Sequence, residues 1–585
     1  MIRFVLISLT LLGSLSFLAC RSQQSPQKTP QTASTIEGLP AKKSIAAKLK
    51  EQNYLPVEIR IATYYRLKAE QAQAYNFENE DEMTMYGYSL LWEDKLNEAL
   101  EIFKLIVAEF PDSSNPYDSL GEAYLALGNK DSALYHYQKS LALNPHNFNA
   151  EDQIERIKYP DKRVLLPSEK FAKRYTPQQY KEDLNQLGKR LIEVNPSALK
   201  FISKQDFWQL IESKKALITA TTTYSEFAWH CSEIIASINC SHTSMGRFYH
   251  ENELLPVSRR FPLKVRLIKD QLFIAEAPSL ETPFQQKDEI LSINGISTTT
   301  IIEQAFSHIS TQGFVESSKS HYFNSWANIM IPFALNFPEA YTIQVKGKEG
   351  EISLRPPKDL KVPVLSKAFS NCRKDLCLEF VGGANHTAVL TISSFNYYRW
   401  NNYEEFTAFI DQSFAEIKEK GIKHLIIDLR FNGGGSPESS IYLLQRLVKE
   451  PFIYFIESGY DTGFDTIQAA EETFAGDLYF LIDGQGNSTT GHFMAVAQEL
   501  KLGSIIGEEL GSNQFCTAGQ TVCRLPNTKL VYYVANTVSR VYVSKAKDEQ
   551  GILPDYYVSQ NIDDYLNHKD VLKAFALALI EEKSQ

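Results

Sequence analysis

The fold of this chain is decided by the stretch Leu478-Tyr479-Phe480-Leu481-Ile482-Asp483-Gly484-Gln485-Gly486-Asn487-Ser488-Thr489-Thr490-Gly491-His492. Its leading apolar run predicts a buried strand, and the pattern from Phe493 to Leu500 predicts a helix after the turn. A buried strand that turns sharply through glycines into a helix is one way to present a serine hydroxyl for nucleophilic attack. The alternative is an ordinary connection in which Ser488 only caps the helix.

A second stretch upstream has a matching design: Leu425-Ile426-Ile427-Asp428-Leu429-Arg430-Phe431-Asn432-Gly433-Gly434-Gly435. Its unbroken apolar run is typical of a strand buried on both faces, as in the parallel sheet of an α/β domain. The glycines after it let backbone N–H groups approach a ligand, because no Cβ intervenes. Such donors stabilise the oxyanion of acyl transfer, and losing one costs about 3–4 kcal/mol of barrier. The alternative is an ordinary glycine-rich turn.

With both stretches in view, residues 386–560 resemble the catalytic domain of the tail-specific (C-terminal-processing) serine proteases. The resemblance implies that 380–585 form an α/β catalytic domain with Ser488 as the nucleophile. It also implies an oxyanion hole from the backbone amides of Gly433, Gly434 and Thr489, and no metal or organic cofactor. The matching elements are Asp428-Leu429-Arg430-Phe431-Asn432-Gly433-Gly434-Gly435, the turn from Asp483-Gly484 to Ser488, Ile505-Ile506-Gly507-Glu508 and Gly551-Ile552-Leu553-Pro554-Asp555.

The chain departs from the Ser–Lys design of that family. Ser–Lys members carry a lysine shortly after the Gly-Glu pair, where this chain has Asn513. They also tend to have a glutamate at the position of Gly491. We therefore expect no Ser–Lys dyad.

The family's other design, similar to the tricorn core protease, uses a histidine preceded by a serine. The segment Ile238-Asn239-Cys240-Ser241-His242-Thr243-Ser244-Met245 resembles that signature. The resemblance implies that His242 is the general base and Ser241 an auxiliary hydroxyl that orients the site. A neutral imidazole is suited to accepting a hydroxyl proton at neutral pH.

Two details of this design stay open in the sequence. A carboxylate should hold the imidazole in the correct tautomer. Asp548 and Glu549 both lie just before Gly551 and are both candidates for that role. His492, one helical turn after Ser488, is the alternative base.

The N-terminal segment predicts export. A positive start at Met1-Ile2-Arg3 precedes an apolar run, and Phe17-Leu18-Ala19-Cys20 resembles a bacterial lipoprotein processing site. The run is shorter than the roughly 20 residues that span a bilayer, which favours a signal peptide over a transmembrane helix. We expect a signal peptide at 1–19, a lipidated Cys20 and a flexible tether over 20–41. The protein would then be anchored in the bacterial cell envelope, facing the periplasm or the exterior.

Composition agrees with an exported protein. Without Cys20 an even six cysteines remain, in three sequence-local pairs, which fits an oxidising compartment. Their pairing is open, and Cys231 and Cys240 can equally be buried apolar residues. No cysteine spacing indicates a zinc site. The formal net charge of −10 argues against nucleic acid as a partner.

The 585 residues leave room for about four domains. Residues 42–160 are predicted to be helical, because Gly87, Ala99, Phe103 and Pro111 recur 34 positions later as Gly121, Ala133, Tyr137 and Pro145. This period resembles a tetratricopeptide repeat, either a partner-binding groove or a structural spacer. Family resemblance implies a helical bundle carrying the Ser-His motif over 165–250. It also implies a PDZ-like domain over 255–358, which would bind a peptide end or be a packed, altered version of that fold.

These observations predict a membrane-anchored, extracytoplasmic serine endopeptidase that cleaves polypeptides through an acyl-enzyme. A different class of function stays open: a catalytically lapsed relative that binds peptides or hydrophobic ligands. An esterase with the same triad is a lesser alternative. Reactivity of Ser488 that depends on His242 separates the enzyme from the binding protein.

Overall fold

The computed structural model describes residues 42–163, 165–245, 254–276, 284–355, 374–381, 386–399, 401–458, 465–544 and 547–584. The predicted signal peptide, Cys20, the tether and Cys372 lie outside the described residues. Within the described part, no helix combines the length and the apolar character that a membrane crossing requires.

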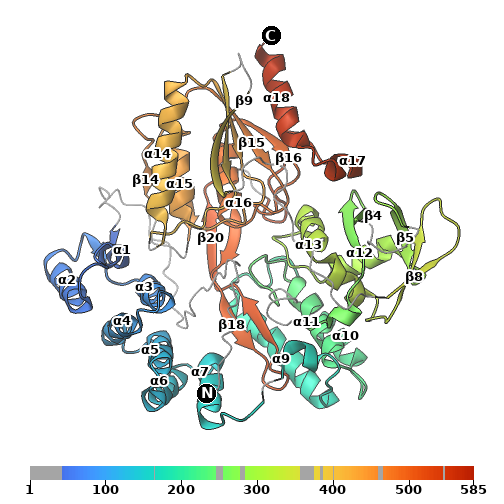
Figure 1. The fold of residues 1–585 in the computed structure, drawn as a ribbon, viewed down its shortest axis with the longest axis horizontal. Coiled ribbons are helices and arrows are strands. Elements are labelled where there is room, and N and C mark those ends of the chain that lie inside the picture. Colours follow the sequence, from blue (N-terminus) through green and yellow to red (C-terminus); the bar gives the residue numbers. More distant parts are fainter. Residues whose placement is uncertain are drawn as a thin grey trace, which may run out of the picture.

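The N-terminal helices form a curved row along one side of the molecule, drawn in blue in Figure 1. Consecutive helices pack as antiparallel pairs at the predicted small residues. A Cβ at Gly87 would lie 2.5 Å from the Phe103 ring, and one at Gly121 would lie 3.1 Å from the Tyr137 ring. The helices are α1 (Ile45–Lys50), α2 (Val57–Glu70), α3 (Glu80–Trp92), α4 (Leu96–Glu109), α5 (Ser114–Ala126), α6 (Lys130–Leu143) and α7 (Phe148–Lys158); strands β1 (Lys43–Ser44) and β2 (Tyr75–Asn76) pair beside them.

A helical bundle follows, and its core is completed by a hairpin from far along the chain. The helices are α8 (Pro167–Lys170), α9 (Pro177–Val194), α10 (Lys204–Leu217) and α11 (Tyr224–Ala236). Strands β18 (Thr521–Arg524) and β19 (Val531–Val534) form the hairpin, and its residues Cys523, Leu530 and Tyr532 are buried in the bundle core. On its other side Arg524 binds Glu151 and Asp152 of α7. The hairpin therefore joins the repeat region to the bundle.

A β-rich module occupies the region of the predicted PDZ-like domain. Its sheet has the order β3-β4-β5-β7-β8, with β6 beside β5, and α13 is kinked at Trp326. Its elements are η1 (Val257–Arg259), β3 (Lys264–Ile268), β4 (Gln271–Glu276), β5 (Glu289–Ile293), β6 (Ile296–Ser297), α12 (Thr298–Phe306), α13 (Glu316–Ala334), β7 (Tyr341–Val345) and β8 (Ile352–Leu354).

The C-terminal region is an α/β domain around a six-stranded sheet of order β21-β16-β15-β11-β10-β9, parallel except for β9. The predicted parallel sheet is confirmed, because β11 and β15 lie side by side with Leu425 opposite Leu478. Its elements are β9 (Leu376–Val381), β10 (Thr387–Ile392), α14 (Tyr403–Glu419), β11 (His424–Asp428), α15 (Pro437–Gln445), β12 (Phe452–Ile453), β13 (Phe455–Glu457), β14 (Thr466–Ile467), β15 (Asp477–Ile482), α16 (Thr489–Glu499), β16 (Ser504–Gly507), β17 (Phe515–Ala518), β20 (Thr537–Val541), β21 (Tyr556–Tyr557), α17 (Ile562–Leu566) and α18 (Val571–Ser584).

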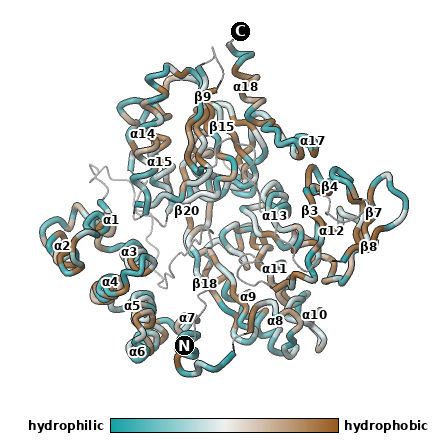
Figure 2. Tube along the Cα trace, in the orientation of Figure 1, coloured by the Kyte–Doolittle hydropathy of each residue, from teal (hydrophilic) through white to brown (hydrophobic). Residues whose placement is uncertain are grey.

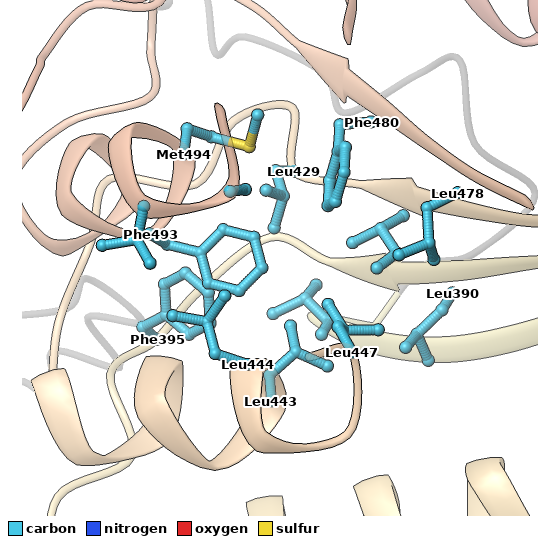
Figure 3. Close-up of a cluster of buried hydrophobic side chains, with 14 of the residues drawn as sticks. Leu390, Phe395, Leu429, Leu443, Leu444, Leu447, Leu478, Phe480, Phe493 and Met494 are labelled. Carbon is cyan, nitrogen blue, oxygen red and sulfur yellow. The ribbon is translucent and has the colours of Figure 1, made fainter. Parts of the chain in front are cut away.

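Helices cover both faces of this sheet, which explains why its strands are apolar throughout. Figure 3 shows Leu443 and Leu444 of α15 in one cluster with Phe493 of α16 and with Leu429, which directly follows β11. On the opposite face α18 packs on Ile426 and other residues of the central strands. The central strands are accordingly the most consistently hydrophobic part of the trace in Figure 2. This core holds the ends of β11 and β15 in fixed register.

A buried ion network anchors the end of β11. The Arg430 guanidinium donates to Asp428 at 2.8 and 2.6 Å and to Asp570, which precedes α18, at 2.7 and 2.8 Å. Arg430→Met would leave two carboxylates without their cation, so we expect a loss of about 3–5 kcal/mol of stability. Native-state hydrogen exchange at the β11 amides measures this loss.

The matched control is Arg446→Met, which removes a more exposed pair with Asp411. We expect this control to change stability by about 0–1 kcal/mol. Equal protection of β11 in the two variants would contradict the anchoring role of Arg430.

Candidate active site

The loop between β15 and α16, residues 483–488, is called here the nucleophile loop. It ends at Ser488, which precedes α16 with φ 56° and ψ −123°. A positive φ is uncommon for a residue with a Cβ, and strained backbone of this kind is concentrated at functional sites. The half-buried Ser488 side chain makes no capping hydrogen bond to the helix. Its hydroxyl is therefore not used as a helix cap.

The glycine turn, residues 432–435, lies directly against the nucleophile loop. The Asn487 N–H donates to the Asn432 carbonyl at 3.2 Å, and the Thr490 hydroxyl donates to the Asn432 side chain at 2.8 Å. A Cβ at Gly434, where φ is +96°, would lie 2.7 Å from the Asn487 oxygen and 2.8 Å from Ser488 Cβ. Only glycine fits this contact.

Two backbone N–H groups near this contact donate no hydrogen bond to any described residue. The Gly434 N–H donates to Asn432 Oδ1 at 3.0 Å, so it is engaged. The N–H groups of Gly433 and Thr489 donate to no group in the described ranges of the chain. Gly433 is exposed, and Thr489 N lies 3.0 Å from the position of a Gly434 Cβ. The structure thus presents Gly433 and Thr489 as the available donors for an oxyanion.

The histidine loop, residues 237–245, reaches this site from the end of α11. It is fixed by the hairpin, because Ser244 and Tyr533 exchange backbone hydrogen bonds at 3.0 and 2.7 Å. The Gln520 side chain also donates to the His242 carbonyl at 2.8 Å. The loop meets the nucleophile loop where the Ser241 hydroxyl donates to Asn487 Oδ1 at 3.0 Å, across 246 residues of sequence.

The imidazole of His242 has two polar neighbours at Nδ1. Ser241 Oγ lies at 3.2 Å and Cys516 Sγ, on β17, at 3.5 Å. Desolvation lowers the pKa of His242 to about 4, so the ring is neutral at physiological pH. A neutral imidazole can accept a proton.

Cys516 contacts both predicted catalytic side chains. Burial raises the pKa of its thiol, while a hydrogen bond with the Ser488 side chain acts in the opposite direction. Among the residues that the structure places, no hydrogen bond joins Ser488 directly to His242. The sequence analysis predicted neither the contact of Cys516 with His242 nor that of Asn487 with Ser241, because neither residue type indicates such a contact.

The two candidate carboxylates lie apart from the imidazole. Burial acts to raise the pKa of Asp548, but hydrogen bonds from Arg540, Lys200 and Gln514 lower it to about 2. The Glu549 side chain is exposed. Within the described segments, neither carboxylate is hydrogen-bonded to His242. The structure therefore brings Ser488, Ser241 and His242 together without an acidic partner.

The alternative base, His492, lies on α16 and is buried. Its ring meets the edges of Tyr454 and Phe455, with centroids 6.4 and 5.4 Å away. Desolvation, followed by the nearby His242, lowers its pKa to about 3. Its Nε2 has no hydrogen-bond partner within the described part.

Gly491 and Asn513 occupy the positions where Ser–Lys members have a glutamate and a lysine, and here both positions serve packing and backbone hydrogen bonds. A Cβ at Gly491 would lie 2.6 Å from Ser512 Oγ and 2.7 Å from Asn513 N, so a larger side chain does not fit. Asn513 donates to the carbonyls of Asp548 and Gln550 at 2.8 and 2.7 Å. At these two positions the chain packs helix α16 against the segment that follows the Gly-Glu pair.

The local cysteine pairs are not disulfides where both members are described. Cys231, Cys240, Cys516 and Cys523 form no disulfide with one another. Cys231, Cys240 and Cys523 all lie in the bundle core, and the Cys240 thiol lies 2.7 Å from the Thr517 hydroxyl. The structure agrees with the alternative given for Cys231 and Cys240, because both side chains are buried.

Residues 386–558 match the sequence model of Peptidase family S41. The chain carries an S41 peptidase domain. Residues 115–147 match the model of the tetratricopeptide repeat. The predicted peptidase family and the predicted repeat are thereby confirmed, and the S41 match supports a serine-type protease that acts on polypeptides.

The chain with its S41 domain is also similar to solved structures. Mature CPAF complexed with lactacystin is 14% identical, over 69% of this chain and 99% of that chain, with a TM-score of 0.49. The photosystem II D1 C-terminal processing protease is 13% identical, over 65% and 93%, with a TM-score of 0.34. The tricorn protease is 14% identical, over 70% and 37%, with a TM-score of 0.34. No curated protein matches the chain in sequence.

Proposed function

We propose that this protein is a serine endopeptidase in which Ser488 is the nucleophile and His242 the general base. The observation that carries the proposal is the meeting of three loops at one point. Ser488 sits on a strained turn, the glycine turn lies against it, and the histidine loop binds Asn487 next to it. An S41 domain is the expected setting for such a site.

In the proposed reaction the Ser488 hydroxyl turns from Cys516 towards His242, and its oxygen attacks the carbonyl carbon of a peptide bond. His242 takes the hydroxyl proton as the C–O bond forms. The amides of Gly433 and Thr489 receive the oxyanion. The protonated His242 then gives its proton to the leaving amine as the C–N bond breaks. Water, deprotonated by His242, hydrolyses the acyl-enzyme and restores Ser488.

The Ser–His assignment rests on what occupies the other positions. Asn513 and Gly491 are committed to packing and to backbone hydrogen bonds, and neither can act as a base. His492 is buried against the rings of Tyr454 and Phe455. His242 is the histidine whose neighbour, Ser241, binds the nucleophile loop.

The surrounding modules suggest how substrate is brought to the site. We place the protein in the bacterial cell envelope, anchored through a lipid on Cys20, with a protein partner on the repeat region. The β-rich module is proposed to act as a PDZ-like domain that holds a substrate end. Its helix α13 contacts the nucleophile loop, since Ser318 donates to the Gly484 carbonyl at 2.6 Å.

A second function is favoured by one observation. The Ser488 side chain lies close to the Cys516 thiol, and in the described part of the chain no hydrogen bond joins it to His242. A site fixed in that arrangement would be unreactive, and the protein would act as a scaffold that binds peptides or hydrophobic ligands.

Labelling with a fluorophosphonate separates the two functions. We expect one adduct, on Ser488, that mass spectrometry locates and that disappears in His242→Ala. The control His146→Ala changes an exposed histidine of the repeat region and should leave labelling intact. Absence of an adduct on Ser488 in the folded wild-type protein would exclude the peptidase and favour the scaffold.

A further inference from the structure

A hydrogen-bond chain connects the general base to the residue before the nucleophile. His242 Nδ1 lies 3.2 Å from Ser241 Oγ, and Ser241 Oγ donates to Asn487 Oδ1 at 3.0 Å. We infer that Asn487, acting through Ser241, is the positioning residue that orients His242, in the place that a carboxylate takes in a Ser-His-Asp triad. This inference rests on the proposed function and names a further residue of the same site.

Counting hydrogens along this chain defines the tautomer. Ser241 has one hydroxyl hydrogen and donates it to Asn487, whose Oδ1 can only accept. The Cys516 thiol likewise directs its hydrogen to the Thr517 carbonyl at 3.4 Å. Both atoms facing Nδ1 therefore offer lone pairs, so Nδ1 carries the hydrogen and Nε2 is left as the proton acceptor. This is the tautomer that a triad carboxylate enforces.

Among the residues that the structure describes, the charged groups around His242 leave no other candidate for this role. The titratable neighbours that act on it are the Cys516 thiol of β17 and His492 of α16, and neither carries a negative charge at neutral pH. Asp548 is held by Arg540 and Lys200. Among the described residues, the amide of Asn487 is thus the terminal acceptor in the chain from His242.

An amide in this place orients the imidazole but supplies no negative charge. The imidazolium that forms during the reaction is consequently not offset by a carboxylate. The neutral base should persist in acid, because the pKa of His242 lies near 4. Activity should rise with pH through the pKa of His242 in the free enzyme. The acid limb of the pH–activity profile should therefore lie well below pH 6.5.

The variant Asn487→Asp tests this inference directly, since it replaces the amide with a carboxylate of the same shape. We expect the acid limb of Ser488 labelling by a fluorophosphonate to move up by about 1–3 pH units. Asn487→Leu removes the acceptor at similar volume, and we expect the labelling rate to fall about 10-fold to 100-fold. Gln485→Glu is the matched control, because it adds the same charge to the same loop at a residue that accepts no hydrogen bond from Ser241.

A second measurement does not depend on reactivity. NMR of histidine labelled with ¹⁵N, with His242→Gln for assignment, reports the tautomer and the pKa of His242. We expect the Nδ1–H tautomer in the wild type, a higher pKa in Asn487→Asp, and loss of the single tautomer in Asn487→Leu. A His242 titration that is the same in wild type and Asn487→Asp would overturn the inference even if Ser488 is labelled. If Ser488 is not labelled but the titration moves as expected, the proposed peptidase fails and the positioning role of Asn487 stands.

Discussion

The variant His242→Ala should hydrolyse peptides with a kcat about 10⁶-fold lower than that of the wild type. Without the imidazole the Ser488 proton loses its proposed acceptor, and residues that act as one unit lose nearly all of their effect together. KM should change little, because His242 acts on the reacting atoms. The measurement is steady-state hydrolysis of an unstructured polypeptide by the wild type and the variant.

A double variant tests whether Ser488 and His242 act as one unit. Ser488→Ala combined with His242→Ala should be about as inactive as either single variant, since each already removes the unit. If His242→Ala keeps about 10⁻² or more of the wild-type activity, another residue must be the base. His492→Phe would then be the next variant, because that ring is the other histidine close to Ser488 in sequence.

Gly434→Ala is expected to have the second largest effect, lowering kcat about 10²-fold to 10³-fold. The new Cβ would lie 2.8 Å from Ser488 Cβ and 2.7 Å from the Asn487 oxygen, at a φ of +96° that L residues rarely adopt. The nucleophile loop must move, which displaces both the hydroxyl and the Thr489 amide. Fluorophosphonate labelling and peptide hydrolysis should fall together.

The neighbouring glycine provides the comparison for this prediction. A Cβ at Gly433 meets no atom within 4 Å, and alanine keeps the N–H. We expect Gly433→Ala to lose at least about tenfold less activity than Gly434→Ala. Equal losses of activity in the two variants would show that the contact between Gly434 and Ser488 does not cause the loss.

Local patterns in the sequence predicted those parts of the structure that local physics determines. The apolar runs before Gly433 and Ser488 became neighbouring parallel strands, because strands buried on both faces must be apolar throughout. The 34-residue period located the repeat helices through Gly87 and Gly121, whose missing side chains leave room for aromatic rings.

What the sequence analysis missed depends on contacts between distant segments. Nothing near Cys516 in the sequence indicates that β17 would bring its thiol to His242. The hairpin β18–β19 lies in the catalytic part of the chain, yet it fills the core of the bundle. Asp548 lies just before Gly551, as the family pattern predicts, but it is paired with Arg540 and Lys200 instead of with His242. Each of these outcomes is set by tertiary packing rather than by residue type or spacing.

The hairpin has a consequence for the protein during its own synthesis. The histidine loop emerges early, yet the strand partner that fixes it, Tyr533, is made near the end of the chain. Ser488, the proposed nucleophile, also lies far downstream of His242, the proposed base. A chain still leaving the ribosome, or still crossing a membrane, therefore holds an unsupported histidine and no completed site. The proposed hydrolytic site would then be complete only in the finished molecule, and premature cleavage of the nascent chain would be avoided.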